Sequence, residues 1–281
     1  MSCAAGLGVR VSKPSIRWLA GLRRAAAGQP TFVFFPHAGG SPLSVGRLAA
    51  ALPDSVGIVA VQLPRGDERA PGEPPRRVAA AADRLAQELA DFHSHDARGP
   101  IHMVLVGNSY GALLAYETAH GLARRALPVR RLIVSGFRAP VLAPSEAPLH
   151  LLPPAQLRAE LAARFGMAPA EIPAGQAEYA DAALRADLEA CETYRHTQAK
   201  PLSAPIDVLR MADDFSLSDS DLQAWQTVTA GSTRVVHCAA GHFPWATHPR
   251  EVASLLTQLA AGSHREQPAC VSPATITTHS E

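Results

Sequence analysis

Residues 101–117 read Ile-His-Met-Val-Leu-Val-Gly-Asn-Ser-Tyr-Gly-Ala-Leu-Leu-Ala-Tyr-Glu, and this stretch decides the fold. The apolar run 101–106 predicts a buried strand, and the Ala/Leu-rich residues after Gly111 predict a helix. A G-x-S-x-G pentapeptide between a strand and a helix is typical of a nucleophile elbow, a sharp turn that lifts a serine hydroxyl above the edge of a sheet. The pentapeptide alone is weak evidence, since Gly/Ser loops are common. The interpretation therefore depends on partners elsewhere in the chain.

Short apolar strands and helices alternate around this stretch. Further strands are predicted at 31–35, 57–62, 131–135, 206–211 and 234–238, and helices at 45–52, 77–92, 110–123 and 249–260. This alternation predicts an α/β fold, in which helices cover both faces of a mostly parallel central sheet. With the elbow, it predicts the α/β-hydrolase fold.

The alternation breaks between residues 140 and 201. Helical stretches at 154–165 and 176–195 occur there without a convincing strand. We interpret 140–201 as a helical lid insertion, because ligands in open α/β sheets bind beyond the carboxyl ends of the strands. The alternative is that these helices are additional scaffold.

Two segments, 17–139 and 202–262, then form the hydrolase core. The ends of the chain, 1–16 and the polar 263–281, are expected to be disordered tails. The cluster of Arg17, Arg23 and Arg24 is interpreted as a solvated helix face.

The composition excludes several classes of function. The 281 residues include 26 basic and 25 acidic side chains, so a net charge of +1 gives no electrostatic footprint for nucleic acid or a charged membrane. No apolar run approaches the ~20 residues of a membrane span. The four cysteines form no C-x-x-C pair, so the sequence indicates no metal site. A disulfide framework is not expected either. We expect a cytoplasmic monomer without metal or cofactor.

The serine of the elbow, Ser109, needs a base, because a hydroxyl is a poor nucleophile by itself. In α/β hydrolases the chain order is serine, acid, histidine, and the histidine follows the last strand. His242 comes directly after Gly241 in that loop. His237, within the predicted strand, and His248, at the start of a helix, are poorer candidates.

The acid that orients the histidine should follow the strand 206–211. Asp213 and Asp214 are adjacent there. Asp214 is preferred, since an apolar residue, Leu217, follows it three positions later, but Asp213 stays open as the alternative.

An oxyanion formed on the substrate needs fixed donors. The backbone N–H of Tyr110, directly after the serine, is one candidate. The second is the N–H of Ala38, in the Gly-rich loop after the first predicted strand.

These segments together resemble the type II thioesterases of polyketide and nonribosomal peptide assembly lines. The similarity spans roughly residues 17–260 in the same order, and the matching segments are Phe-Phe-Pro-His-Ala-Gly-Gly (34–40), Val-Gln-Leu-Pro (61–64), the elbow with its helix (107–117), Leu-Arg-Ala-Asp (184–187), Cys-Glu-Thr-Tyr (191–194) and Gly-His-Phe (241–243). The resemblance implies a discrete thioesterase that acts on acyl groups held by the phosphopantetheine of acyl or peptidyl carrier proteins. It also implies Ser109 as nucleophile, His242 as base, Asp214 as acid, and Ala38 and Tyr110 as oxyanion donors.

The chain departs from the family pattern at the elbow. Asn108 stands where histidine is usual, and Tyr110 where methionine is usual. The larger side chain of Tyr110 is expected to narrow the acyl pocket. The acid loop also lacks the usual glycines and proline.

The sequence supports one leading hypothesis and two alternatives. The leading one is hydrolysis of carrier-bound acyl thioesters through an acyl-serine intermediate, for editing or release. The first alternative is a small-molecule esterase or lipase with the same triad. The second is a non-catalytic carrier-binding protein.

Overall fold

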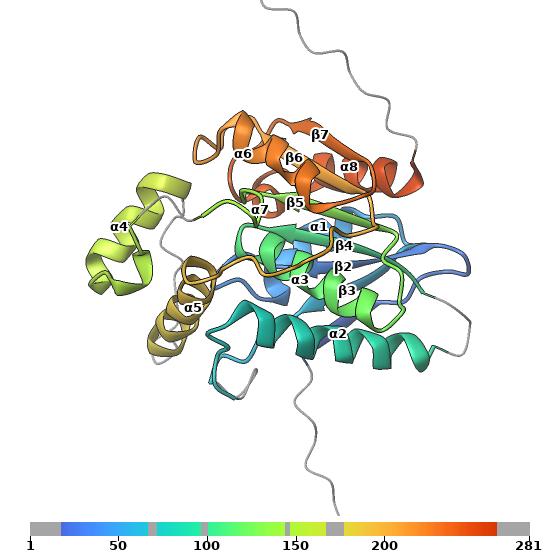
Figure 1. Ribbon diagram of the computed structural model, residues 1–281, viewed down its shortest axis with the longest axis horizontal. Helices are drawn as coiled ribbons and strands as arrows, with labels where there is room; N and C mark the ends of the chain where they lie inside the picture. The colour runs from blue at the N-terminus through green and yellow to red at the C-terminus, as the bar shows by residue number, and fades with distance from the viewer. Residues whose placement is uncertain (1–17, 67–71, 97–100, 144–146, 167–176, 263–281) are drawn as a thin grey trace, which may run out of the picture.

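The computed structural model describes residues 18–66, 72–96, 101–143, 147–166 and 177–262 (Figure 1). Both expected tails, 1–16 and 263–281, lie outside the described residues. No described helix is long and apolar enough to cross a membrane.

The described strands form one seven-stranded sheet in the order β1-β3-β2-β4-β5-β6-β7. Their bounds are β1 Leu19–Arg23, β2 Pro30–Phe35, β3 Gly57–Val61, β4 His102–Asn108, β5 Arg131–Ser135, β6 Ile206–Met211 and β7 Thr233–Cys238. Only β1 runs antiparallel to its neighbour, β3; the other paired strands are parallel. Parallel pairing places the carboxyl ends of β2 and β4 to β7 at one edge of the sheet, where ligands bind in folds of this kind. The predicted fold class is confirmed.

The interpretation of the arginine cluster as a helix face is wrong for the residues that the structure describes. Arg23 ends strand β1, and its guanidinium donates to the Val56 carbonyl at 3.0 Å and pairs with Asp54 at 3.0 Å. A five-residue edge strand with a central glycine has too weak a periodic pattern to be predicted. Arg17 lies outside the described residues.

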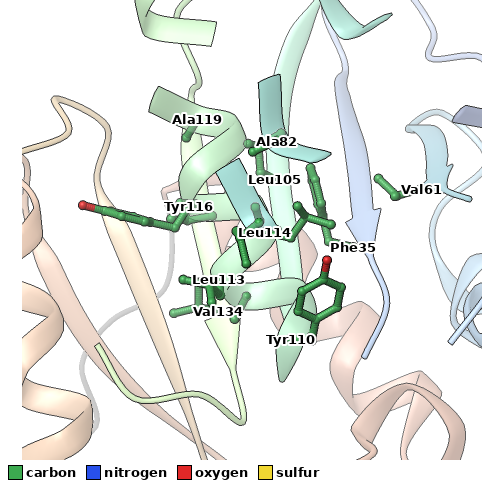
Figure 2. Packing of buried hydrophobic residues seen from close by; sticks show 14 of the residues in the cluster. Phe35, Val61, Ala82, Leu105, Tyr110, Leu113, Leu114, Tyr116, Ala119 and Val134 are labelled. Carbon is green, nitrogen blue, oxygen red and sulfur yellow. The ribbon is translucent and has the colours of Figure 1, made fainter. Parts of the chain in front are cut away.

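Helices cover both faces of the sheet, because alternate strand residues point to opposite sides. In β2, Phe32 and Phe34 belong to the buried cluster that includes α1 (Gly46–Ala51) and α8 (Pro249–Ala261). Val33 and Phe35 belong to the cluster on the other face, with α2 (Val78–Ser94) and α3 (Tyr110–Arg124). Figure 2 shows part of this second cluster, with side chains of α3 against β4 and β5. Each fully buried Leu or Phe side chain stabilises the fold by about 1.5–3 kcal/mol.

All the regular secondary structure described between residues 140 and 201 is helical. The insertion contains η2 (Leu149–Leu151), α4 (Pro154–Phe165) and α5 (Ala177–Glu192). Figure 1 shows α4 and α5 to one side of the layers that cover the sheet. Short helices that the sequence does not predict are η1 Pro42–Val45, α6 Asp219–Gln223, η3 Ala224–Val228 and α7 Pro244–Thr247.

Candidate active site

The elbow is a strained turn between β4 and α3. Ser109 adopts φ 55° and ψ −126°, a positive φ that costs a residue with a side chain about 1–3 kcal/mol. Close packing explains both glycines. A Cβ on Gly107 would lie 2.3 Å from the carbonyl oxygen of Gly111, and one on Gly111 would lie 1.9 Å from that of Phe35. No side chain fits at either position, so the serine is held at the end of β4 by sterics.

The structure pairs His242 with Asp214. The imidazole Nδ1 lies 2.7 Å from the Asp214 Oδ2, and both side chains are buried. The other carboxylate oxygen accepts hydrogen bonds from the hydroxyl of Ser216 at 2.6 Å and from its N–H at 3.1 Å. Asp213, the open alternative, is exposed, and its N–H donates to the carbonyl of Ala240. The geometry therefore selects Asp214 as the partner of the histidine.

Opposing effects act on the ionisation of Asp214. Burial raises its pKa, but the hydrogen bond and charge of His242 and the two hydrogen bonds from Ser216 outweigh burial, so the pKa lies below its ordinary value. Asp214 is thus a carboxylate at neutral pH.

Asn108 holds the backbone of the histidine loop. Its buried side chain donates from Nδ2 to the carbonyl of His242 at 3.1 Å, and its Oδ1 accepts the hydroxyl of Ser135 at 2.7 Å. Gly136 leaves the space that the imidazole occupies, since a Cβ there would lie 3.1 Å from the His242 Cε1. The last residue of α4, Phe165, packs on the imidazole with ring centroids 4.5 Å apart.

The loop after β2 carries the other candidate donor, the N–H of Ala38. Its neighbour Gly39 donates its N–H to the carboxylate of Asp187 at 2.8 Å and accepts from the guanidinium of Arg65 at 2.6 Å. Tyr110 is the first residue of α3, so its N–H is among those that a helix leaves without an internal partner. The loop that carries Ala38 is thus held on both sides of Gly39, and Tyr110 begins a helix.

One cavity joins these elements at the carboxyl edge of the sheet. Ser109 and His242 both line it, together with Ala38. Its remaining wall is mostly apolar and comes largely from the insertion and the loops after β5 and β6: Phe137, Pro140, Leu142, Ala147, Leu149, Leu161, Phe165, Leu184, Leu188 and Leu217. The described residues include no group of three or more His, Cys, Asp or Glu side chains that could hold a metal ion. A serine, a buried His–Asp pair and backbone donors beside an apolar cavity are suited to acyl transfer.

The comparison with protein families agrees with this arrangement. A model of the thioesterase domain matches residues 30–259. The chain belongs to the thioesterase family. The chain is 28% identical over 256 residues to a probable cadicidin biosynthesis thioesterase of Streptomyces griseus, covering 90% of this chain and 68% of that protein. It is 30% identical over 232 residues to thioesterase PikA5 of Streptomyces venezuelae, covering 80% and 79%.

Solved thioesterase structures share the fold. The chain is 33% identical to RedJ, the thioesterase of the prodiginine pathway in Streptomyces coelicolor, with a TM-score of 0.72 over 85% of this chain and 88% of that one. It is 28% identical to YbtT, a type II thioesterase from the yersiniabactin pathway, with a TM-score of 0.75 over 88% and 99%. The family resemblance drawn from the sequence is confirmed.

Two further residues of this thioesterase, His37 and Asp187, lie at or next to the site, and the sequence alone does not identify them. His37 lines the cavity and packs edge-on against Phe243. Burial, followed by the charges of His242 and Arg65, lowers the pKa of His37 to about 4, so its ring is neutral at pH 7. Asp187, on α5 of the insertion, accepts the N–H of Gly39, the residue after Ala38. His37 lies in the matching segment 34–40 and Asp187 in the segment 184–187. Neither segment shows what these side chains contact.

The expectation that Tyr110 narrows the acyl pocket is wrong. Its side chain is 2% exposed and belongs to the buried cluster of Phe35 and Val61, and it does not line the cavity (Figure 2). The cause is the position of Tyr110 in the first turn of α3, which packs on the sheet. Among the described residues, the buried Tyr110 hydroxyl has no hydrogen-bond partner.

Proposed function

We propose that this thioesterase hydrolyses acyl thioesters on the phosphopantetheine of carrier proteins, acting as a discrete monomer in editing or release. The observation that carries the proposal is one apolar cavity that joins the elbow serine to the buried His242–Asp214 pair. Relatives that act in polyketide or nonribosomal peptide pathways, such as YbtT, support the choice of a carrier-bound substrate.

In the first half of the proposed reaction, Ser109 attacks the thioester carbonyl while His242 Nε2 takes the hydroxyl proton. The carbonyl oxygen becomes an oxyanion, which the Ala38 and Tyr110 N–H groups stabilise. Asp214, bonded to Nδ1, orients the imidazole and stabilises its cationic form. The C–S bond then breaks, His242 returns the proton to the pantetheine sulfur, and the acyl group remains as an ester on Ser109.

In the second half, water attacks the ester carbonyl. His242 takes a proton from that water, the same N–H groups stabilise the second oxyanion, and the C–O bond to Ser109 breaks. The proton on His242 returns to the serine oxygen, and the free acid leaves. We propose that the 140–201 insertion acts as the lid, because α4 and α5 supply much of the apolar wall around the acyl chain.

The test is release of acyl groups from loaded carrier protein. We expect a Ser109→Ala variant to fold normally and to lose roughly 10⁶-fold in kcat. A Ser94→Ala variant, changed at the end of α2, is the matched control. A fluorophosphonate should label wild type at Ser109 and leave the variant unlabelled. Faster turnover of simple oxygen esters than of carrier thioesters would favour the esterase alternative, and an unlabelled wild-type protein would favour the carrier-binding one.

A further inference from the structure

Asp187, in the insertion, contacts the loop after β2 that carries Ala38 (residues 36–40), here called the oxyanion loop. It lies on α5, its side chain is buried, and its Oδ2 accepts the N–H of Gly39 at 2.8 Å across 148 residues of sequence. The next peptide unit toward the N-terminus carries the N–H of Ala38, the proposed oxyanion donor. The carboxylate therefore acts one peptide unit away from the donor.

The other side of this loop is held from the loop after β3. Arg65 Nη2 donates to the Gly39 carbonyl at 2.6 Å and also to that of Gly40. With its N–H bound by α5 and its C=O bound by Arg65, Gly39 has little freedom to rotate. A donor that is fixed before the reaction needs no reorganisation when charge develops on the substrate.

Close packing shows that α5 rests directly on the loop. Gly39 has φ 73°, and a Cβ there would lie 3.2 Å from Leu184 Cδ1. Leu184 is three residues before Asp187, so both side chains lie on one face of the helix. Leu184 also lines the cavity. The helix face that borders the acyl site is thus the face that holds the oxyanion loop.

We propose that Asp187 is a positioning residue for the oxyanion hole: its hydrogen bond to Gly39 couples the docking of α5 to the placement of the Ala38 N–H. The hole is complete only while α5 sits on the loop. This inference rests on the proposed function, because it assumes that Ala38 serves as a donor for Ser109 chemistry.

Stability alone does not account for a carboxyl group at this position. The charged and titratable groups that face Asp187 are Arg65, the Tyr110 hydroxyl and the Cys191 thiol. Burial raises the pKa of Asp187 to about 7, and the Gly39 hydrogen bond and Arg65 only partly oppose it. Burying the ionised carboxylate is costly in free energy. The contact with the loop needs only an oxygen that accepts the Gly39 N–H.

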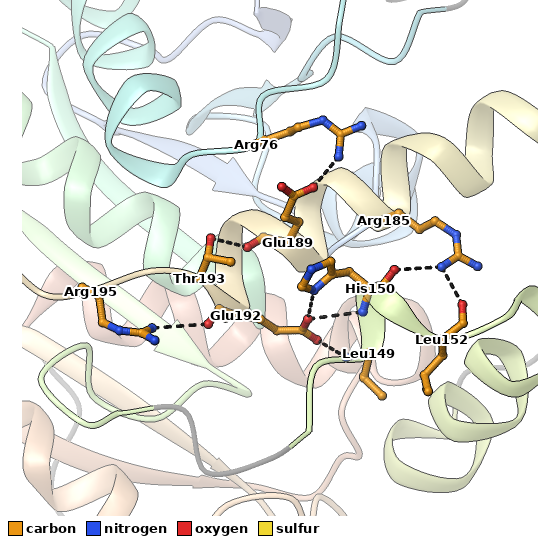
Figure 3. Close-up of polar contacts among 9 residues, drawn as sticks. All are labelled: Arg76, Leu149, His150, Leu152, Arg185, Glu189, Glu192, Thr193 and Arg195. Carbon is orange, nitrogen blue, oxygen red and sulfur yellow. Dashed lines mark hydrogen bonds and ion pairs between the residues drawn. The ribbon is translucent and has the colours of Figure 1, made fainter.

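The experiment compares Asp187→Asn, which keeps an acceptor oxygen, with Asp187→Ala, which removes it. Glu189→Gln is the control, since it removes the ion pair with Arg76 from another side of α5 (Figure 3). Hydrolysis of an octanoyl-pantetheine thioester is measured per active site, counted by fluorophosphonate titration. We expect Asp187→Ala to lose about 10- to 100-fold in kcat with little change in KM. Asp187→Asn should keep most of the wild-type kcat, and Glu189→Gln all of it.

A second measurement is independent of turnover. Hydrogen exchange of the amides in 37–40 should be faster in Asp187→Ala than in wild type, but not in Asp187→Asn or Glu189→Gln. If Asp187→Ala does not fold, Asp187→Leu, which fills the volume without an acceptor, replaces it. Wild-type kcat in the Ala variant, or an Asn variant as impaired as the Ala variant, would overturn the proposal. Failure of the proposed function would look different, because the wild-type protein itself would be inactive and unlabelled by the fluorophosphonate. The hydrogen-exchange comparison would still show whether Asp187 holds the loop.

Discussion

The carboxyl edge of the sheet and helix α5 form two sides of the same cavity, but different forces hold them. At the sheet edge, backbone sterics dominate: Gly107 and Gly111 stand where any Cβ would collide with main-chain atoms. Helix α5 packs Leu188 and Ala190 into the buried core and is also attached by polar side chains that reach the loop after β2 and the segment around η2. The contrast shows that the elbow serine is held by backbone packing, whereas the position of α5 also depends on side-chain hydrogen bonds that single substitutions can remove.

The attachments of α5 are concentrated in the two motifs matched there. Arg185 donates to the carbonyls of His150 and Leu152, and Glu192 accepts from the N–H groups of Leu149 and His150 and from the His150 ring (Figure 3). Tyr194, just beyond the helix, donates its hydroxyl to Glu117 of α3 at 2.6 Å. Each contact is a side-chain hydrogen bond, so each can be tested separately.

The largest expected effect in this comparison is at the sheet edge. Asp214→Asn should lower kcat by about 10⁴-fold, because an amide cannot stabilise the imidazolium and favours the wrong tautomer. The exposed neighbour provides the control: Asp213→Asn should keep the wild-type rate. Steady-state kinetics on a carrier-bound thioester measures both, and equal losses in the two variants would contradict the assignment of Asp214.

A smaller effect is expected on the α5 side. Glu192→Ala leaves the N–H groups of Leu149 and His150 without their acceptor, at a cost of about 1–3 kcal/mol in the free energy of unfolding. Urea denaturation measures this loss, and limited proteolysis should cut within 147–152 sooner than in wild type. Thr193→Ala, changed at an exposed neighbour, is the control. A Glu192 variant as stable and protease-resistant as that control would show that α5 does not depend on this contact.

The two sides should also respond oppositely to acid. His37 has its pKa lowered to about 4 in the folded state from an ordinary 6.5, so the unfolded chain binds more protons and stability falls as pH drops from 6.5 toward 4. Asp187, raised to about 7 from 3.8, binds its proton more readily in the folded state, so stability rises as pH drops from 7 toward 3.8.

Unfolding free energies measured across this range separate the two groups. His37→Gln should lose less stability than wild type on acidification, and Asp187→Asn should lose more. Each difference amounts to at most about 1.4 kcal/mol per pH unit. The pKa of His120 is also lowered to about 4 by burial, but it is common to all three proteins and cancels. Parallel curves for the three proteins would contradict these shifts.

The smallest expected effect concerns Tyr110, whose buried hydroxyl has no partner among the described residues. Tyr110→Phe removes that unpaired group and should raise the free energy of unfolding by about 1 kcal/mol. Tyr116→Phe is the matched comparison, because the Tyr116 hydroxyl does bond, to His196 at 3.0 Å, and should not gain. A loss of stability in Tyr110→Phe would indicate that its hydroxyl is satisfied in solution.

The sequence by itself determined the features that depend on local pattern. The strand–turn–helix around Ser109, the histidine after the last strand and the helix 154–165 all follow from residue periodicity and chain order, and the structure has them where the sequence predicts them. The family resemblance followed from the same segments. Strand β1 escaped prediction because it is short and is the outermost strand on one side of the sheet, where a strand carries little apolar pattern.

Only the tertiary structure decided which side chains meet across the chain. The selection of Asp214 over Asp213, the contact of Asn108 with the His242 carbonyl and that of Asp187 with Gly39 each join segments at least 28 residues apart. The direction of Tyr110 likewise depends on how α3 packs on the sheet. Such outcomes depend on the side-chain directions of elements that are distant in sequence, and residue type and spacing do not contain that information.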